Sequence, residues 1–199
     1  LAFLQPERPS SYRTSPFLFL PNISPQLQLH VLDQVRKPKF VVMDTMDLWI
    51  NTARLPLLEV IRRVDLLTVN ESEARHLTAE KTLLRAAKTL LGFGPKYVLI
   101  KKGEHGSILF SQDSLFMMPA YPLEEVHDPT GAGDSFAGGF IGSLAAAPKI
   151  TQKAIRHSMA YGSVVASFGV EAFSLDRLCT LTREQIEQRA ALFREMMRL

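Results

Sequence analysis

The chain has 199 residues, of which 46% are hydrophobic and 22% are charged, as is ordinary for a globular protein. Its 23 basic and 20 acidic side chains leave a formal net charge of +3, which is too small to predict binding to nucleic acid or to an anionic membrane. No apolar run approaches the roughly 20 residues of a membrane-spanning helix, and none has the pattern of a signal peptide, so we expect no membrane anchor.

The cysteine and histidine content argues against two kinds of site. Cys179 is the single cysteine, which excludes a disulfide framework within the chain and is typical of a reducing compartment, so we expect a cytoplasmic protein. The five histidines include no His-x-x-x-His pair and have no cysteine partners. The sequence therefore does not favour a metal site built on histidine.

A proline-rich start gives way to alternating strand and helix patterns. Residues 1–25 contain five prolines, which forbid a regular helix and leave room for a short strand in the apolar run FLFL. Residues 39–44 (KFVVMD) form a valine-rich run that is typical of a strand buried on both faces. Residues 53–64 have helical spacing, and residues 65–77 (DLLTVNESEARHL) predict a second strand that leads into a helix.

The same alternation continues to the end of the chain. The expected elements are a helix over 80–94, a strand at 97–103, a hairpin over 106–120 around the turn SQDS, and helices over 134–147, 151–168 and 182–199. Gly92 and Gly94 would end the first of these helices. Thr182 and Gln185 predict a capping box that opens the last one.

Strands that alternate with helices predict an α/β fold with a mainly parallel central sheet. The sequence has no internal repeat and no evident boundary, so we expect a single domain over residues 1–199. Ligands of open α/β sheets bind beyond the carboxyl ends of the strands. Polar or glycine-rich residues that follow three strands could converge there: Asp44, Asn70 with Glu73, and Lys102 with Gly103. Asp44 is equally a candidate N-cap for the helix that follows it.

Residues 128–139 (DPTGAGDSFAGG) place a glycine-rich loop before a run of small and apolar residues. Glycine lets a ligand approach the main chain, and the first N–H groups of a helix that starts here would have no partners within the helix. Together with the helix dipole, these groups favour an anion such as a phosphate. Asp134, at the same helix start, could accept the proton of an alcohol that attacks phosphorus.

A purely structural explanation of this stretch is also open. A glycine-rich turn capped by the aspartate, with Gly138, Gly139 and Gly142 present for helix packing, would account for the same residues. Other phosphate-binding loops fit worse. The sequence has no G-x-x-x-x-G-K-[ST] motif, and Phe136 stands where a dinucleotide-binding fingerprint needs its third glycine.

Three motifs, in the correct order, resemble those of the ribokinase-like (PfkB) carbohydrate kinases. Residues 128–140 (DPTGAGDSFAGGF) resemble the second signature of that family, D-T-x-G-A-G-D-x-F. Residues 70–74 (NESEA) resemble its N-x-x-E motif, and residues 100–110 (IKKGEHGSILF) resemble its T-x-G-x-x-G strand–turn–strand. The resemblance covers nearly the whole chain from residue 17 onward. It implies a three-layer ribokinase-like α/β fold, with a mainly parallel sheet flanked by helices.

The resemblance also implies roles for individual residues. Asp134 would be the catalytic base, and the anion hole for the γ-phosphate of ATP would be made by the backbone N–H groups of Gly131, Ala132 and Gly133. Asn70 and Glu73 would hold Mg²⁺ near the phosphates, mostly through water, because magnesium sheds its hydration shell reluctantly. The residues implied in nucleotide binding are Asn70, Lys102, Gly103, Gly106 and Thr130.

A monovalent cation such as K⁺ is a further implication of the resemblance. Asp128 and residues 166–173 (ASFGVEAF) fall where many family members bind such a cation and where they border the adenine pocket. The sequence departs from the family pattern nearby, because Pro129 stands where threonine is commonest. Lys101 and Lys102 likewise replace the usual threonine approach to the glycine at position 103.

The N-terminal third of the family fold has no counterpart in this sequence. In the family that part carries a small β-sheet lid, a Gly-Gly motif and most contacts to the sugar. The first residue is Leu1 rather than Met, so we expect a partial chain, which could be inert by itself. Dimers through the lid are common in the family, and a homodimer is therefore an open alternative to a monomer.

The activity that the resemblance implies is ATP-dependent transfer of a phosphoryl group to a hydroxyl of a small sugar. A nucleoside such as adenosine is the alternative acceptor, because the same loop and base would serve either one. A non-catalytic nucleotide-binding protein on this scaffold is a second alternative. The presence of Asp134 argues against it, because a protein freed from catalysis has no need of that carboxylate.

Overall fold

The structure is a computed structural model, and it describes residue 7 and residues 9–197. Its strands are β1 (Phe17–Leu20), β2 (Phe40–Met43), β3 (Leu66–Asn70), β4 (Tyr97–Lys101), β5 (Ser107–Phe110) and β6 (Leu115–Met118). Its α-helices are α1 (Pro25–Gln34), α2 (Asp47–Thr52), α3 (Arg54–Arg62), α4 (Glu71–Thr78), α5 (Leu83–Gly92), α6 (Ala132–Ala146), α7 (Gln152–Gly169), α8 (Asp176–Cys179) and α9 (Arg183–Met196). Two short 3₁₀ helices are η1 (Ser10–Tyr12) and η2 (Gly103–His105). Pro6 and the last two residues of the expected C-terminal helix lie outside the described residues.

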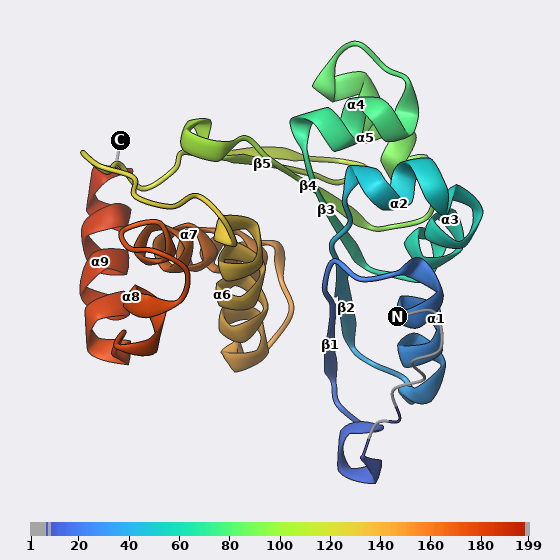
Figure 1. The fold of residues 1–199 in the computed structure, drawn as a ribbon, viewed down its shortest axis with the longest axis horizontal. Helices are drawn as coiled ribbons and strands as arrows, with labels where there is room; N and C mark the ends of the chain where they lie inside the picture. The colour runs from blue at the N-terminus through green and yellow to red at the C-terminus, as the bar shows by residue number, and fades with distance from the viewer. Residues whose placement is uncertain (1–6, 8, 198–199) are drawn as a thin grey trace. The chain divides into compact units, whose positions relative to one another are not determined.

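The strands form one six-stranded sheet with the order β1-β2-β3-β4-β5-β6. The first four strands pair in parallel, and helices connect them (Figure 1). Strands β5 and β6 are joined by a tight turn, in which the backbone N–H of Ser111 donates to the carbonyl of Ser114 at 2.9 Å. The predicted alternation of strands and helices is confirmed, including the hairpin, and the sheet is mixed rather than wholly parallel.

The chain divides into two compact units. The first unit comprises residues 1–102 and 108–116 and contains β1 to β4 with α1 to α5. The second unit comprises residues 103–107 and 117–199 and contains α6 to α9. The expectation of a single domain over the whole sequence stays a prediction.

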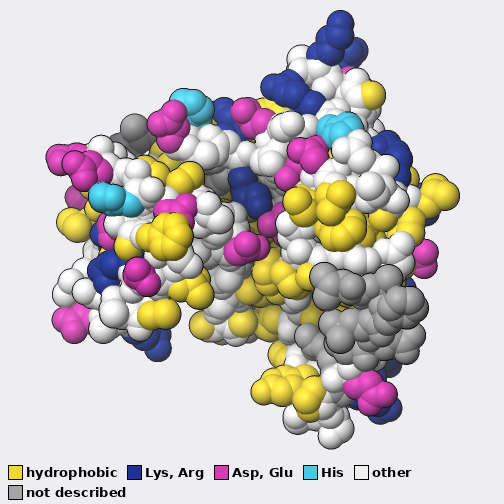
Figure 2. Space-filling model, in the orientation of Figure 1, with side chains coloured by type: hydrophobic (Ala, Val, Ile, Leu, Met, Phe, Trp, Pro, Cys, Tyr) yellow, Lys and Arg dark blue, Asp and Glu magenta, His cyan; other side chains and the backbone are white. Residues whose placement is uncertain are grey.

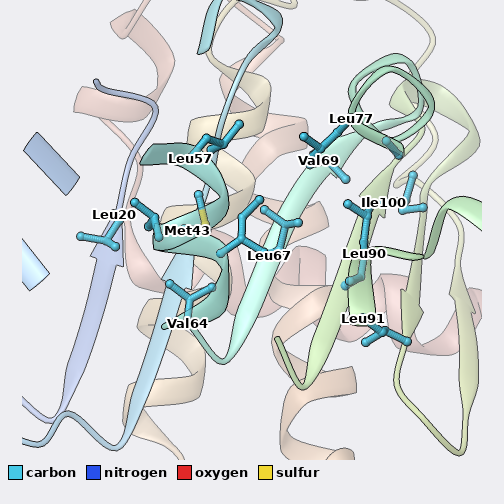
Figure 3. Close-up of a cluster of buried hydrophobic side chains, with 14 of the residues drawn as sticks. Leu20, Met43, Leu57, Val64, Leu67, Val69, Leu77, Leu90, Leu91 and Ile100 are labelled. Carbon is cyan, nitrogen blue, oxygen red and sulfur yellow. The ribbon is translucent and has the colours of Figure 1, made fainter. Parts of the chain in front are cut away.

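The core of the first unit lies between the sheet and its helices. Successive residues of a strand point to opposite faces of the sheet, so every second residue can join one cluster. Figure 3 shows this cluster, which includes Leu67 and Val69 of β3, Leu57 of α3 and Leu90 of α5. Every residue of β2 is buried, which confirms the expectation that the valine-rich run is a strand covered on both faces.

Helices α6 and α7 pack closely in the second unit because small residues line their contact. A Cβ atom at Gly162 of α7 would lie 2.7 Å from the carbonyl oxygen of Phe136 in α6, so only glycine fits there. In α6, a Cβ at Gly139 would also meet α7. Gly138 and Gly142 have no neighbour within 4 Å of such an atom, so the packing explanation holds for one of these three α6 glycines.

Three helices appear that the sequence pattern did not predict: α1, α2 and α8. Helix α1 starts at Pro25, where the missing N–H of proline is tolerated, and it buries Gln28 beside Leu32, which weakens its apolar periodicity. Helix α8 has only four residues, too few for a periodic pattern. Helix α6 begins at Ala132, two residues before the expected start, and Gly131 is its N-cap.

Acidic and basic side chains are interspersed on the face shown in Figure 2, rather than gathered by sign. This distribution accords with the small formal net charge of +3. Of the helices in the described residues, none is long and apolar enough to cross a membrane.

Candidate active site

The glycine loop opens the 15-residue helix α6 in the second unit. Gly131 has a φ of 78°, in the left-handed region that favours glycine, and the helix starts directly after it. A Cβ at this position would meet no atom within 4 Å, so the backbone conformation, and not lack of space, requires the glycine. The loop thus turns sharply into the start of a helix. The first backbone N–H groups of a helix have no hydrogen-bond partners within it.

One of the three amides expected in the anion hole already has a partner. The N–H of Ala132 donates to the carbonyl of Pro129 at 3.2 Å, within the turn that precedes the helix. The first hydrogen bond of the helical type runs from the N–H of Ser135 to the carbonyl of Gly131 at 2.9 Å. The amides of Gly133 and Asp134 precede it, so these two are the ones that the helix geometry leaves for an anion.

Asp134 lies in the first turn of α6, and its side chain is exposed. The N-cap position belongs to Gly131, which has no side chain, so the aspartate is not the cap that a purely structural explanation requires. A carboxylate at this position is favoured by the positive end of the helix dipole. The structure therefore leaves this carboxylate accessible to a ligand at the helix start.

Asp128 ties the start of the glycine loop to the segment that follows α7. Its Oδ1 accepts the N–H of Thr130 at 2.9 Å, and its Oδ2 accepts the N–H of Ser174 at 3.1 Å. These hydrogen bonds, above all the one from Thr130, lower the pKa of Asp128. The N–H groups of His127 and Asp128 donate to the carbonyl of Val170 at 2.8 and 3.4 Å. The structure thus brings together the two segments for which the resemblance implies a monovalent cation.

In the first unit, Asn70 and Glu73 form a capping box at the start of α4. The N–H of Glu73 donates to Asn70 Oδ1, and the N–H of Asn70 donates to Glu73 Oε2, both at 2.8 Å. Glu73 is only 7% exposed. Burial raises the pKa of Glu73 to about 7, against the lowering effects of the Asn70 N–H and the Lys101 ammonium.

An ion pair between Asp44 and Lys101 lies beside this capping box, and sequence reasoning did not find it. Lys101 is the register partner of Asn70 in the β3–β4 pairing, and its Nζ lies 2.8 Å from Asp44 Oδ2. Asp44 follows β2 on the other side of β3, so the lysine side chain crosses the carboxyl end of β3. Met46, not Asp44, is the N-cap of α2, so the alternative that Asp44 serves as an N-cap is wrong.

Lys102, the lysine expected at the nucleotide, points elsewhere in this cluster. Its Nζ lies 3.9 Å from Oε1 of Glu71, in the first turn of α4. Neighbouring residues at a strand end point to opposite sides, which is why Lys101 and Lys102 have different partners. In the sequence, Lys101 and Lys102 both lie near the end of a predicted strand and both replace the usual threonine of the family, so nothing local distinguishes Lys101.

Gly103 is the first residue of the 3₁₀ helix η2, which belongs to the second unit, and Gly106 follows directly after that helix. Gly106 lies against the backbone of Met118 and Pro119, where no side chain fits. The expected site residues are therefore divided between the units. Asn70, Glu73 and Lys102 belong to the first, and Gly103, Gly106, Asp128 and residues 130–134 to the second. That the two sets form one active site stays a prediction.

The residues of the capping box fit a magnesium ion. Carboxylate and amide oxygens are the protein ligands that Mg²⁺ prefers, usually together with several waters. The raised pKa of Glu73 means that burial disfavours its ionised form, which a cation nearby would stabilise. Within the described residues, no group of three or more His, Cys, Asp or Glu side chains could hold a metal ion.

The fold places the chain among the ribokinase-like α/β proteins. The structure of aminoimidazole riboside kinase from Salmonella enterica superposes with a TM-score of 0.76 and 20% sequence identity, over 89% of this chain and 63% of that one. The family model described as pfkB family carbohydrate kinase matches residues 15–181. The chain belongs to the pfkB family of carbohydrate kinases, which confirms the resemblance seen in its motifs.

Two curated relatives show how much of such a protein this chain represents. The chain is 36% identical over 139 residues to a cytidine kinase of Thermococcus kodakarensis, covering 67% of this chain and 49% of the relative. It is 36% identical over 118 residues to a bifunctional ribokinase/ribose-5-phosphate isomerase A of Fructilactobacillus sanfranciscensis, covering 57% of this chain and 21% of the relative. The chain therefore spans about half of the first relative and less of the second.

Proposed function

We propose that the whole protein transfers the γ-phosphoryl group of ATP to a hydroxyl group of a small sugar. Membership of a carbohydrate kinase family supports the reaction class. The observation that carries the proposal is the helix start at Gly131, where two backbone amides without helical partners precede the first helical hydrogen bond and an exposed carboxylate, Asp134, lies in the same turn.

In this reaction Asp134 accepts the proton of the acceptor hydroxyl as its oxygen attacks the γ-phosphorus. The bond between that phosphorus and the oxygen that bridges to the β-phosphate breaks, and the electron pair leaves with ADP. The amides at positions 133 and 134, with that of Ala132 if it is released from Pro129, donate to the oxygens of the transferring group. Phosphate donors and base lie within one turn, so the backbone itself orients them.

The first unit would supply the metal site of the same reaction. Asn70 and Glu73 would hold Mg²⁺, mostly through water, and the bound ion would neutralise charge on the β- and γ-phosphates. The Lys101 ammonium, register partner of Asn70, would add positive charge beside them. Asp128, whose ionised form is stabilised by two backbone N–H groups, would serve a monovalent cation near Thr130.

A nucleoside is the second candidate acceptor. Among the relatives described above, one is named a cytidine kinase and another a bifunctional ribokinase/ribose-5-phosphate isomerase A, so the similarity favours neither class. Incubation of the whole protein with ATP and a panel of sugars and nucleosides separates the two, with formation of ADP as the measurement. We further propose that the protein works in the cytoplasm, and a homodimer stays an alternative to a monomer.

The test of the proposed function is the variant Asp134→Asn. We expect it to lose at least about 1,000-fold in kcat, because the base is absent, while ATP affinity changes less than about threefold. The matched control is Asp113→Asn, which alters an exposed aspartate in the β5–β6 turn and should keep full activity. Full turnover by Asp134→Asn would refute the assignment of the base, and nucleotide binding without turnover in the natural sequence would favour the non-catalytic alternative.

A further inference from the structure

We propose that Arg189, in the C-terminal helix α9, is a positioning residue that sets the geometry of the segment leading into the glycine loop. The inference rests on the proposed function, because it assigns a kinetic effect to that geometry. Helix α9 begins at Arg183 and lies beyond residues 15–181, which the family model matches. The proposed role therefore belongs to a part of the chain that the family match does not include.

Arg189 is fixed from three directions. Its Nη2 lies 2.6 Å from Oε1 of Glu171, and its Nη1 donates to Oγ of Ser167 at 2.9 Å. The guanidinium carbon Cζ lies over the ring of Phe168, 3.4 Å from the ring centroid. The side chain is only 18% exposed. A guanidinium that has two polar partners, lies over an aromatic ring and is mostly buried is held in one position, unlike that of an exposed arginine.

The contact with Glu171 leads to the end of the segment that carries Asp128. The preceding residue, Val170, accepts the N–H groups of His127 and Asp128 with its carbonyl. Three residues after Glu171, Ser174 donates its N–H to Asp128 Oδ2 from a left-handed conformation with a φ of 54°. Such a conformation is costly for serine, so the surrounding contacts must hold it. Arg189 is one of these contacts, because it pairs with Glu171 early in the turn, and Arg177 is another, with its Nε 3.4 Å from Oε2 of the same carboxylate.

Arg189 also contacts the start of the same segment. Its Cζ lies 5.0 Å from the centroid of the Tyr121 ring, which packs edge-on against Phe193 of α9 with centroids 5.7 Å apart. The N–H of Tyr121 donates to Oγ of Ser163 in α7 at 3.2 Å. The segment from Tyr121 to the glycine loop is thus held at its start by α7 and α9, and at its end by the turn that Arg189 pins.

Between these two anchors the segment has little support of its own. It borders a hollow of about 420 Å³, which Glu171 and Arg189 also line. Residues 124–127 are exposed, so their side chains do not fix the path of the backbone. The position of Asp128, and of the amides that follow it, therefore depends on the anchors. A shift of the loop by a fraction of an ångström misplaces donors that act on the transferring phosphate.

The test compares Arg189→Ala with Arg183→Ala in the whole protein. Arg183 is on the same helix, but its side chain is 87% exposed and pairs with Glu187 on the surface, so it controls for the loss of a positive charge. We expect Arg189→Ala to lower kcat about tenfold and to change the KM for the acceptor less than about twofold, because the loop acts on the transferring phosphate. Arg183→Ala should match the natural sequence.

Two further variants separate positioning from a loss of folded protein. Arg189→Lys keeps the positive charge but loses the planar guanidinium that reaches two partners at once. Its kcat should lie between those of Arg189→Ala and the natural sequence. Glu171→Gln should lower kcat as Arg189→Ala does, and the double variant should be no worse than the more severe single one. A kcat loss that vanishes when rates are divided by the folded fraction would overturn the proposal, as would equal kinetics for Arg189→Ala and Arg183→Ala.

Amide hydrogen exchange tests the same proposal without any assay of activity. Exchange of residues 127–135 should be faster in Arg189→Ala than in Arg183→Ala, while exchange within the β-sheet stays unchanged. Equal exchange in that segment would overturn the positioning role even if the natural sequence is an active kinase. Faster exchange in a protein that transfers no phosphate would support the positioning of the loop and refute the proposed reaction, so the two failures are distinguishable.

Discussion

At the scale of single residues, four polar side chains at the carboxyl ends of β2, β3 and β4 have partners within the protein. Asn70 and Glu73 cap α4, and Asp44 neutralises Lys101 across the end of β3. Each group thus has a structural partner in the absence of a ligand. A bound phosphate or cation would have to compete with these partners, so stability and binding are linked at this edge of the sheet.

We predict that Lys101→Met destabilises the protein by about 3 kcal/mol, because it leaves the buried Asp44 carboxylate without its cation. The measurement is the free energy of unfolding in urea. The double variant Asp44→Asn/Lys101→Met should recover most of the loss, since no uncompensated charge remains.

The matched control for this prediction is Lys96→Met. Lys96 also pairs with an aspartate, Asp65, at 2.7 Å, but its side chain is 72% exposed. An exposed pair contributes about 1 kcal/mol or less, so this variant should unfold at nearly the natural urea concentration. Equal losses for the two lysine variants would show that the Asp44–Lys101 pair has no special stabilising role.

At the scale of elements, two helices start in different ways, and the difference suits different ligands. In helix α4, the side chain of Asn70 accepts the amide of Glu73 in the first turn. Helix α6 has glycine at the N-cap, and the amides of residues 133 and 134 are left to a ligand. The side-chain cap stabilises its helix by itself, whereas the glycine start leaves an anion site at the helix end.

The packing of α6 on α7 leads to two predictions of opposite sign. Gly162→Ala should destabilise the protein by about 1–3 kcal/mol, because the added Cβ would press on the carbonyl of Phe136 and force the helices apart. Gly138→Ala should stabilise it by about 0.5–1 kcal/mol, because alanine has the higher helix propensity and the Cβ has open space.

The measurement is thermal unfolding of the two alanine variants, followed by far-UV circular dichroism, which reports on secondary structure. A stabilising effect at Gly162 would mean that the two helices are not held as closely as the structure has them. A destabilising effect at Gly138 would mean that this face of α6 is covered by something that the described residues do not include.

At the scale of the whole molecule, the proposed activity needs residues from both compact units. We predict that Glu73 of the first unit and Gly131 of the second each contribute to the binding of ATP with Mg²⁺. Glu73→Gln in the first unit and Gly131→Ala in the second should each weaken ATP–Mg²⁺ binding about tenfold, the first by removing a charge and the second by straining the left-handed N-cap.

Isothermal titration of the whole protein with ATP and Mg²⁺ measures both affinity and stoichiometry. The controls are Glu59→Gln, an exposed glutamate of α3, and Gly142→Ala, an α6 glycine with open space around it. Both controls should bind as the natural sequence does. If one of the two test variants bound ATP and Mg²⁺ as the natural sequence does, the role proposed for that residue would be wrong.

Local patterns in the sequence determined much of this protein. Short valine-rich runs become buried strands because their side chains suit both faces of a sheet, as in β2. The capping box of Thr182 and Gln185 depends on residues three apart, and it opens α9 as expected. The family signature at 128–140 is likewise local, because a phosphate loop is made by consecutive backbone groups, and the family match confirms the resemblance that it carries.

Only the tertiary structure decided which distant side chains meet. The partnership of Lys101 with Asp44 joins two strand ends that are 57 residues apart, and nothing in either local sequence distinguishes Lys101 from Lys102. In the sequence, Arg189 is one more polar residue of an amphipathic helix. Its contacts with Glu171, Ser167 and Phe168 are evident only in the tertiary structure. Periodicity reports which face of an element is buried, but the identity of the partner is set by how the elements pack, and that is a property of the whole fold.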